Sequence, residues 1–131
     1  NCIEGMCATP ALCARLDLPA SALIDLLDSH PIWDVVANQL AHLCNTLVMV
    51  ASPQKISIGG GVMNRAMLYD KIRARFLAIN NGYVQNRALE AGFDGLDQFI
   101  APSHFGAQAG IVGASFLAMV AYEKKTQALP A

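Results

Sequence analysis

A β-branched run that leads directly into three glycines and then into a helix is the feature that most constrains this chain. Residues 55–64 read Lys-Ile-Ser-Ile-Gly-Gly-Gly-Val-Met-Asn, which predicts a strand over Lys55–Ile58. The glycines leave the backbone bare, so that a ligand can approach it closely. Open α/β sheets bind their ligands at the carboxyl ends of their strands. The segment therefore points to nucleotide or phosphate chemistry, and a tight strand-to-helix turn is the structural alternative.

Two better-known glycine motifs do not fit this segment. A P-loop requires a lysine and a hydroxyl residue after its last glycine, whereas Val62 and Met63 follow Gly61. A dinucleotide fingerprint requires a third glycine, where Asn64 stands, and an acidic residue about 20 positions further on. Ile79 lies in that region instead. Both motifs are therefore excluded.

Helical patterns lie on both sides of the predicted strand. Apolar periodicity and end signals predict helices over Thr9–Arg15, with Thr9 as the N-cap, and over Ala20–Asp28, Pro31–Val50, Asn64–Ile79 and Gly106–Lys124. The longest of them should bury one face made of Ile32, Val35, Val36, Leu40, Leu43, Leu47 and Val50. Trp33 is expected in the core or at an interface between lobes, and the charges from Arg65 to Arg75 on a solvated helix face.

A second strand is predicted late in the chain. Residues 83–97 are polar and interrupted by glycine, which predicts a loop with at most one helical turn, and Gln98–Ala101 follows as a strand. The order strand, helix, strand, helix implies an α/β fold with parallel strands joined by a crossover. Because two strands do not make a stable sheet and Asn1 starts within a motif, we expect an incomplete chain. In the last helix, small residues predict close packing against a neighbour: Gly106, Gly110, Gly113 and Ala114.

The composition restricts the compartment and the partners. Apolar residues make up 54% of the 131 residues and charged residues only 15%, which indicates that part of the apolar surface meets other protein. A net charge of −1 with scattered basic residues predicts no binding to nucleic acid. No apolar run is long enough to predict a membrane span. The cysteines stand in helical context without a disulfide framework, so we expect reduced thiols in a cytoplasmic protein: Cys2, Cys7, Cys13 and Cys44.

Short segments with a specific order and spacing run through nearly the whole chain, except for residues 84–98. They are Asn1–Gly5, Pro10, Arg15, Pro31–Asp34, Ser52–Ile56, Gly59–Met63 and Ala109–Ala114. Together they closely resemble the carboxyl-terminal part of the fructokinases in the ROK family of sugar kinases. The resemblance implies an actin-like (ribonuclease H-like) α/β fold with parallel strands flanked by helices. Residues 1–131 would form the later part of the second of two lobes, and the upstream lobe and the start of this lobe would be absent.

The resemblance assigns roles to two residues near the start of the chain. Cys2 matches the last ligand of a structural zinc site held by a histidine and cysteines, whose other members would precede Asn1. Such ligands suit tetrahedral zinc, whereas the alternative is a small buried apolar residue. Glu4 matches a glutamate that accepts hydrogen bonds from the hydroxyls of a bound sugar, and the alternative is a solvated surface carboxylate. Cys7 and Cys13 match no ligand and are interpreted as core residues.

The glycine segment resembles the adenosine side of an ATP site. Gly59, Gly60 and Gly61 would admit the nucleotide, and Val62 and Met63 would contact the adenine of Mg-ATP. The catalytic aspartate of the family belongs to an upstream segment, so no catalytic residue is assigned in this chain. The last helix of the family often begins Gly-Asp-Asn-Ala-Gly, whereas residues 106–110 read Gly-Ala-Gln-Ala-Gly, which weakens any expectation of side-chain contacts to ligand there.

The implied activity of the parent enzyme is transfer of the γ-phosphate of ATP to the 6-hydroxyl of fructose, with this chain inactive alone. A glucose or mannose kinase of the same family is an alternative, because the choice of sugar depends on residues mostly upstream. A sugar-sensing transcriptional repressor of the family is another, and it would carry a helix-turn-helix domain before the sugar-binding lobes. The implied partners are the hexose, the missing amino-terminal part of the same protein and a second copy in a homodimer.

Overall fold

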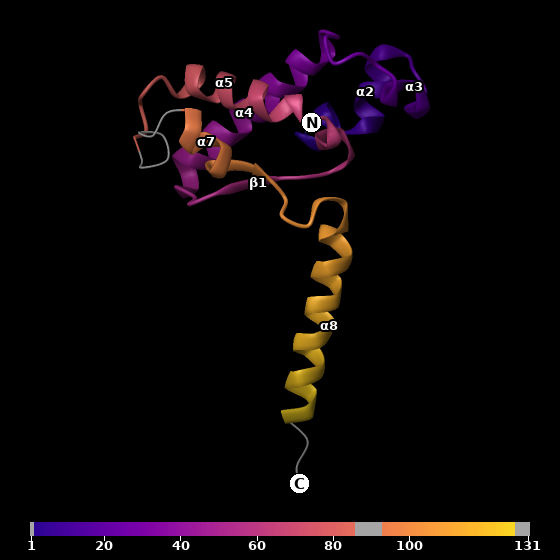
Figure 1. Ribbon diagram of the computed structural model, residues 1–131, viewed down its shortest axis with the longest axis vertical. Helices are drawn as coiled ribbons and strands as arrows, with labels where there is room; N and C mark the ends of the chain where they lie inside the picture. Colours follow the sequence, from indigo (N-terminus) through magenta and orange to yellow (C-terminus); the bar gives the residue numbers. More distant parts are fainter. Residues whose placement is uncertain (1, 86–92, 128–131) are drawn as a thin grey trace.

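The computed structural model of this chain describes residues 2–85 and 93–127, which form a helix-rich body and one long projecting helix (Figure 1). The fold is mixed α/β, as predicted. The helices are α1 (Glu4–Cys7), α2 (Thr9–Leu16), α3 (Ala20–Ile24), α4 (Ile32–Ala51), α5 (Met67–Asn80), α7 (Phe93–Phe99) and α8 (Ala109–Gln127). The strands are β1 (Ile56–Ile58) and β2 (Ile100–Pro102), and the 3-10 turns are η1 (Gly61–Asn64) and η2 (Gly106–Gln108).

The two strands pair in parallel, which confirms the predicted strand–helix–strand order. Ile56 lies opposite Ile100, and Ile58 lies opposite Pro102. The chain therefore leaves both strands at the same edge, since parallel strands end side by side. The three glycines follow β1 at that edge, and this is where the candidate site lies.

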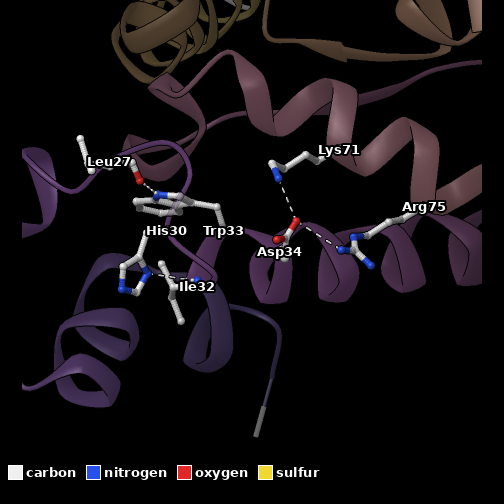
Figure 2. Close-up of polar contacts among 7 residues, drawn as sticks. All are labelled: Leu27, His30, Ile32, Trp33, Asp34, Lys71 and Arg75. Atoms are coloured by element: carbon white, nitrogen blue, oxygen red, sulfur yellow. Dashed lines mark hydrogen bonds and ion pairs between the residues drawn. The ribbon is translucent and has the colours of Figure 1, made fainter.

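The core forms mainly where α4 and α5 pack along one another. Asp34 of α4 accepts hydrogen bonds from Lys71 Nζ at 2.8 Å and from Arg75 Nη2 at 3.2 Å, both on α5 (Figure 2). The largest fully buried side chains include Trp33 and Phe76, one from each helix. Trp33 is thus a core residue, as one of its two interpretations required.

The buried face of α4 differs from the predicted one. Val35, Leu47 and Val50 are exposed, with Val50 reaching 81%. The buried face instead includes five residues that the predicted face did not include: Trp33, Ala37, Ala41, Cys44 and Val48. Apolar residues stand on more than one side of this helix, so periodicity alone does not determine which side faces the core.

Several element ends also differ from the prediction. Ala8, not Thr9, is the N-cap of α2, and it makes no side-chain cap. The helix predicted to begin at Asn64 is a 3-10 turn over Gly61–Asn64 followed by α5 from Met67. The helix predicted to reach Asp28 ends at Ile24.

Helix α7 occupies part of the segment predicted as a loop. The second strand therefore begins at Ile100, not at Gln98 as predicted. The ring centroids of Phe99 and Phe76 lie 6.2 Å apart, and Leu96 is fully buried. Contacts with α5 thus stabilise a helix that its local sequence does not favour. The part of the predicted loop at residues 86–92 lies outside the described residues.

Arg73 contradicts the prediction of a solvated charged face on α5. The residue is 8% exposed, and its Nε and Nη2 donate to the carbonyl oxygen of Ile100 at 3.0 and 2.8 Å. Nη2 also donates to the carbonyl oxygen of Asp97 at 3.2 Å. The guanidinium therefore satisfies backbone oxygens where α7 meets β2, which a sequence pattern of alternating charges does not reveal.

Helix α8 extends away from the body (Figure 1). Its large apolar side chains are exposed: Ile111 70%, Phe116 62%, Leu117 70% and Met119 59%. Within the described part of the chain, nothing lies within 4 Å of a Cβ built at Gly110 or Gly113, so the close neighbour predicted for this helix is not present there. Among the described residues, no helix combines the length and the apolarity needed to cross a membrane.

Candidate functional site

The turn after β1 has a backbone conformation that requires glycine. Gly60 has φ +106° and ψ 166°, a combination that essentially glycine alone adopts. The amide of Met63 donates to the carbonyl oxygen of Gly60 at 3.0 Å and starts the 3-10 turn. A Cβ built at Gly60 or Gly61 would meet nothing within 4 Å. The backbone here is therefore both strained for other residues and open to a ligand.

A hollow of about 430 Å³ brings the predicted sugar-binding and nucleotide-binding residues together. Glu4 lines it from α1, and the whole segment Gly59–Met63 lines it from the end of β1 and from η1. The other lining residues are Ile3, Cys7, Ala8, Thr9, Pro10, Leu40 and Ile58. We call this space the first hollow. Its walls are largely apolar, as is typical of small-molecule sites.

Glu4 is an exposed residue in the first turn of α1. Among the described residues its carboxylate has no hydrogen-bond or ion-pair partner, so both oxygens can accept hydrogen bonds. Cys7, on the same helix, is buried, and burial raises the pKa of its thiol. Cys7 is thus the core residue that the sequence indicated, while Glu4 is exposed.

Sequence reasoning missed the contribution of Ala8, Thr9 and Pro10 to the first hollow. The Thr9-Pro10 pair carried a signal, but only for the start of a helix. Its proximity to the glycine turn depends on how α2 packs against α1 and how α1 packs against α4, which no local pattern encodes.

A second hollow of about 440 Å³ lies against the same glycines. Asn64 and Ser103 line it, together with Tyr69, Gly106 and Gly110. Both polar residues follow the carboxyl end of a strand, so the rule that directs attention to Gly59 would also have identified them. The Tyr69 hydroxyl donates to the carbonyl oxygen of Ile58 at 2.7 Å, and burial raises the pKa of this phenol, which keeps the donor protonated.

Cys2 is exposed. Across residues 2–85 and 93–127, no three histidine, cysteine, aspartate or glutamate side chains gather to hold a metal ion. Tetrahedral zinc requires four ligands, of which Cys2 would supply one. The zinc role of Cys2 therefore stays a prediction that depends on donors from elsewhere.

Comparison with known proteins identifies relatives over nearly the whole chain. A profile of the ROK family matches residues 1–121. A fructokinase of Pediococcus pentosaceus is 34% identical over 120 residues, covering 92% of this chain and 38% of the relative. A fructokinase of Zymomonas mobilis subsp. mobilis is 30% identical over 124 residues, covering 95% of this chain and 38% of the relative. The chain thus spans less than half the length of these relatives, and it belongs to the ROK family.

Proposed function

We propose that this chain is part of an ATP-dependent hexose kinase that phosphorylates the 6-hydroxyl of fructose. One observation carries the proposal: a carboxylate without a partner among the described residues and a bare glycine turn line the same hollow of about 430 Å³. A kinase must hold a polyhydroxylated acceptor and a nucleotide side by side, and these two features suit those two tasks. The fructokinase names of the relatives support the same activity.

The glycine turn is the proposed adenosine side of the ATP site. Gly60 and Gly61 leave room beside the backbone, and Val62 offers an apolar surface to a base. Met63 is 7% exposed, so little of its side chain is available to a ligand, in contrast to the contact with adenine predicted for it. ATP supplies the phosphoryl group, and these residues would contribute its position, on which phosphoryl transfer largely depends.

Glu4 is the proposed acceptor for sugar hydroxyls. An ionised carboxylate accepts hydrogen bonds from two hydroxyls at once, with charge-assisted strength. This orients the sugar but does not take up the proton of the attacking hydroxyl. No aspartate lines the first hollow within the described residues, so the catalytic base is expected from an upstream segment.

Two metal ions belong to the proposal. Mg²⁺ would accompany ATP and neutralise charge on its phosphates, and no residue of this chain is assigned to it. A structural Zn²⁺ would take the Cys2 thiolate as one of its ligands. All four cysteines are unpaired, which suits the reducing cytoplasm that we propose as the compartment.

The amino-terminal part of the same protein and a second copy are the proposed protein partners. The exposed apolar residues of α8 support such contacts, because a helix that is apolar on all sides is normally buried.

The test is a kinase assay with the full-length protein, ATP and a panel of hexoses. We expect fructose to be the best acceptor and Glu4→Ala to raise the KM for fructose about tenfold, with the KM for ATP within twofold. Asp25→Ala, which removes an exposed carboxylate outside the hollow, is the control.

The outcomes separate the alternatives. Equal changes in both KM values would contradict the role of Glu4. A higher activity with glucose or mannose than with fructose would identify that sugar as the substrate. Sugar binding without phosphoryl transfer, in a protein that also carries a helix-turn-helix domain, would favour the repressor.

A further inference from the structure

We propose that Arg65 is a positioning residue that holds the glycine turn against the segment from α3 to α4 and thereby shapes the nucleotide side of the site. The inference rests on the proposed kinase function. Arg65 follows η1 directly and precedes α5, so it stands at the exit of the turn. Its side chain is only 18% exposed, although the sequence predicted a solvated charge.

The guanidinium of Arg65 binds the end of α3. Its Nη2 donates to the carbonyl oxygens of Leu23 at 3.0 Å and Ile24 at 2.8 Å, and its Nη1 pairs with Asp28. Carbonyls at the end of a helix lack partners within the helix, and a planar fork of donors can satisfy two of them together. These contacts join residues that lie about forty positions apart in the sequence.

On its other side, the guanidinium of Arg65 packs on the buried ring of Trp33. The Cζ atom of Arg65 lies 4.3 Å from the ring centroid of Trp33, which is 1% exposed. The indole Nε1 donates to the carbonyl oxygen of Leu27 at 2.8 Å, which fixes the loop before α4 (Figure 2). Arg65 is therefore fixed by hydrogen bonds on one side and by a buried ring on the other.

Among the described residues, Met63 also holds the turn, because it is 7% exposed and packs in the core, but Gly61 and Val62 border open space at the exit. A third hollow of about 390 Å³ separates the turn from α3, and Arg65 lines that space together with Gly61, Val62 and Asn64. The amide of Arg65 reaches the carbonyl oxygen of Val62 only at 3.4 Å. Tyr69 anchors the entry of the turn through the carbonyl of Ile58, and Arg65 anchors its exit. Without the guanidinium, Gly61 and Val62 have room to move away from the first hollow.

The experiment compares variants of the full-length protein. In Arg65→Ala we expect the KM for ATP to rise about tenfold, the effect of losing roughly one charge-assisted hydrogen bond, while the KM for fructose stays within twofold. Arg65→Lys should also raise the KM for ATP, because one ammonium cannot both serve two carbonyls and stack on the ring. The rise should be smaller than in Arg65→Ala, because lysine keeps one charged donor. Asp28→Asn should leave both constants unchanged, since this carboxylate is 63% exposed. Arg75→Ala removes the same group from a half-exposed position on α5, where it pairs with Asp34 and lines none of the three hollows, and is the matched control.

Hydrogen exchange of the peptide containing residues 59–64 provides a readout independent of catalysis. Arg65→Ala should speed its exchange at least about threefold, and Arg75→Ala should not. A folded Arg65→Ala variant with the ATP constant and exchange of the control would overturn the proposal. If that variant does not fold, an unchanged ATP constant in Arg65→Lys would overturn it instead. A wild-type protein without ATP-dependent activity would refute the proposed function, and the exchange data would still decide whether Arg65 holds the turn.

Discussion

Gly60 lines the first hollow and has a backbone conformation that favours glycine. Its φ of +106° with ψ 166° is a conformation that other residues reach only at a cost of about 1–3 kcal/mol. Gly61 lies beside it, faces equally open space and has no positive φ. The two neighbours therefore differ in backbone strain but not in crowding.

This difference gives a matched pair of substitutions. We expect Gly60→Ala to lower the free energy of unfolding by about 1–3 kcal/mol and to raise the KM for ATP, because the turn must shift to relieve the strain. Gly61→Ala adds the same methyl group without strain and should stay within about 0.5 kcal/mol of the parent. Urea unfolding and ATP titration of the full-length protein measure both effects. Equal behaviour of the two variants would mean that the strained turn is not what the site depends on.

Among single residues, the sequence predicted the glycine turn but not the buried roles of two arginines, Arg65 and Arg73. Glycine signals its role by the conformations that it alone allows, so three in a row after a strand are informative. Arg65 and Arg73 resemble any exposed helix charge in the sequence. Their partners are backbone carbonyls of distant elements, which no spacing rule identifies.

At the scale of elements, α4 and α5 are joined by a charge cluster on their exposed edge. Hydrogen bonds from Lys71 and then Arg75 hold the pKa of Asp34 below its ordinary value of 3.8. A carboxyl group with a lowered pKa in the folded state stabilises the fold above the unfolded pKa, and this contribution disappears as the pH falls through the lower folded value. The ion pairs therefore contribute near neutral pH and are lost in acid.

Asp34→Asn tests this contribution. We expect the parent to exceed the variant in stability at pH 6, and the difference to shrink as the pH falls below about 3.8. The difference should also fall with added salt, because the groups are accessible to solvent. Urea midpoints measured across this pH range provide the comparison, with Asp25→Asn as a control for an exposed carboxylate that has no ion pair in the described part of the chain. A difference independent of pH would exclude the ion pairs as its cause.

The elements themselves were largely predictable, because long apolar patterns and proline or glycine breaks define where helices begin and end. Helix α7 was the main error. Its burial against α5, through Phe99 and Leu96, compensates for a weak local preference.

At the scale of the whole molecule, the apolar side chains of α8 are exposed, and packing within the described part of the chain does not cover them. Leu117 is 70% exposed and Phe116 62%. We proposed above that the rest of the protein or a second copy covers this helix.

Leu117→Asp in the full-length protein tests that coverage. If other protein covers the helix, burying the new carboxylate should lower the melting temperature by about 5 °C or more. Lys124→Gln in the last turn of α8 is the control and should leave it unchanged. An unchanged melting temperature in Leu117→Asp would mean that the helix stays exposed.

The sequence alone determined the strand, the glycine turn, the parallel order and the family, because these depend on backbone sterics, on periodicity and on short motifs. The tertiary structure decided which side of α4 is buried, which arginines are desolvated, and that Glu4 lines the same hollow as Gly60. Those outcomes depend on contacts between segments far apart in the chain. Residue patterns restrict such contacts but do not specify them, since several faces of a helix can be apolar and only packing selects one.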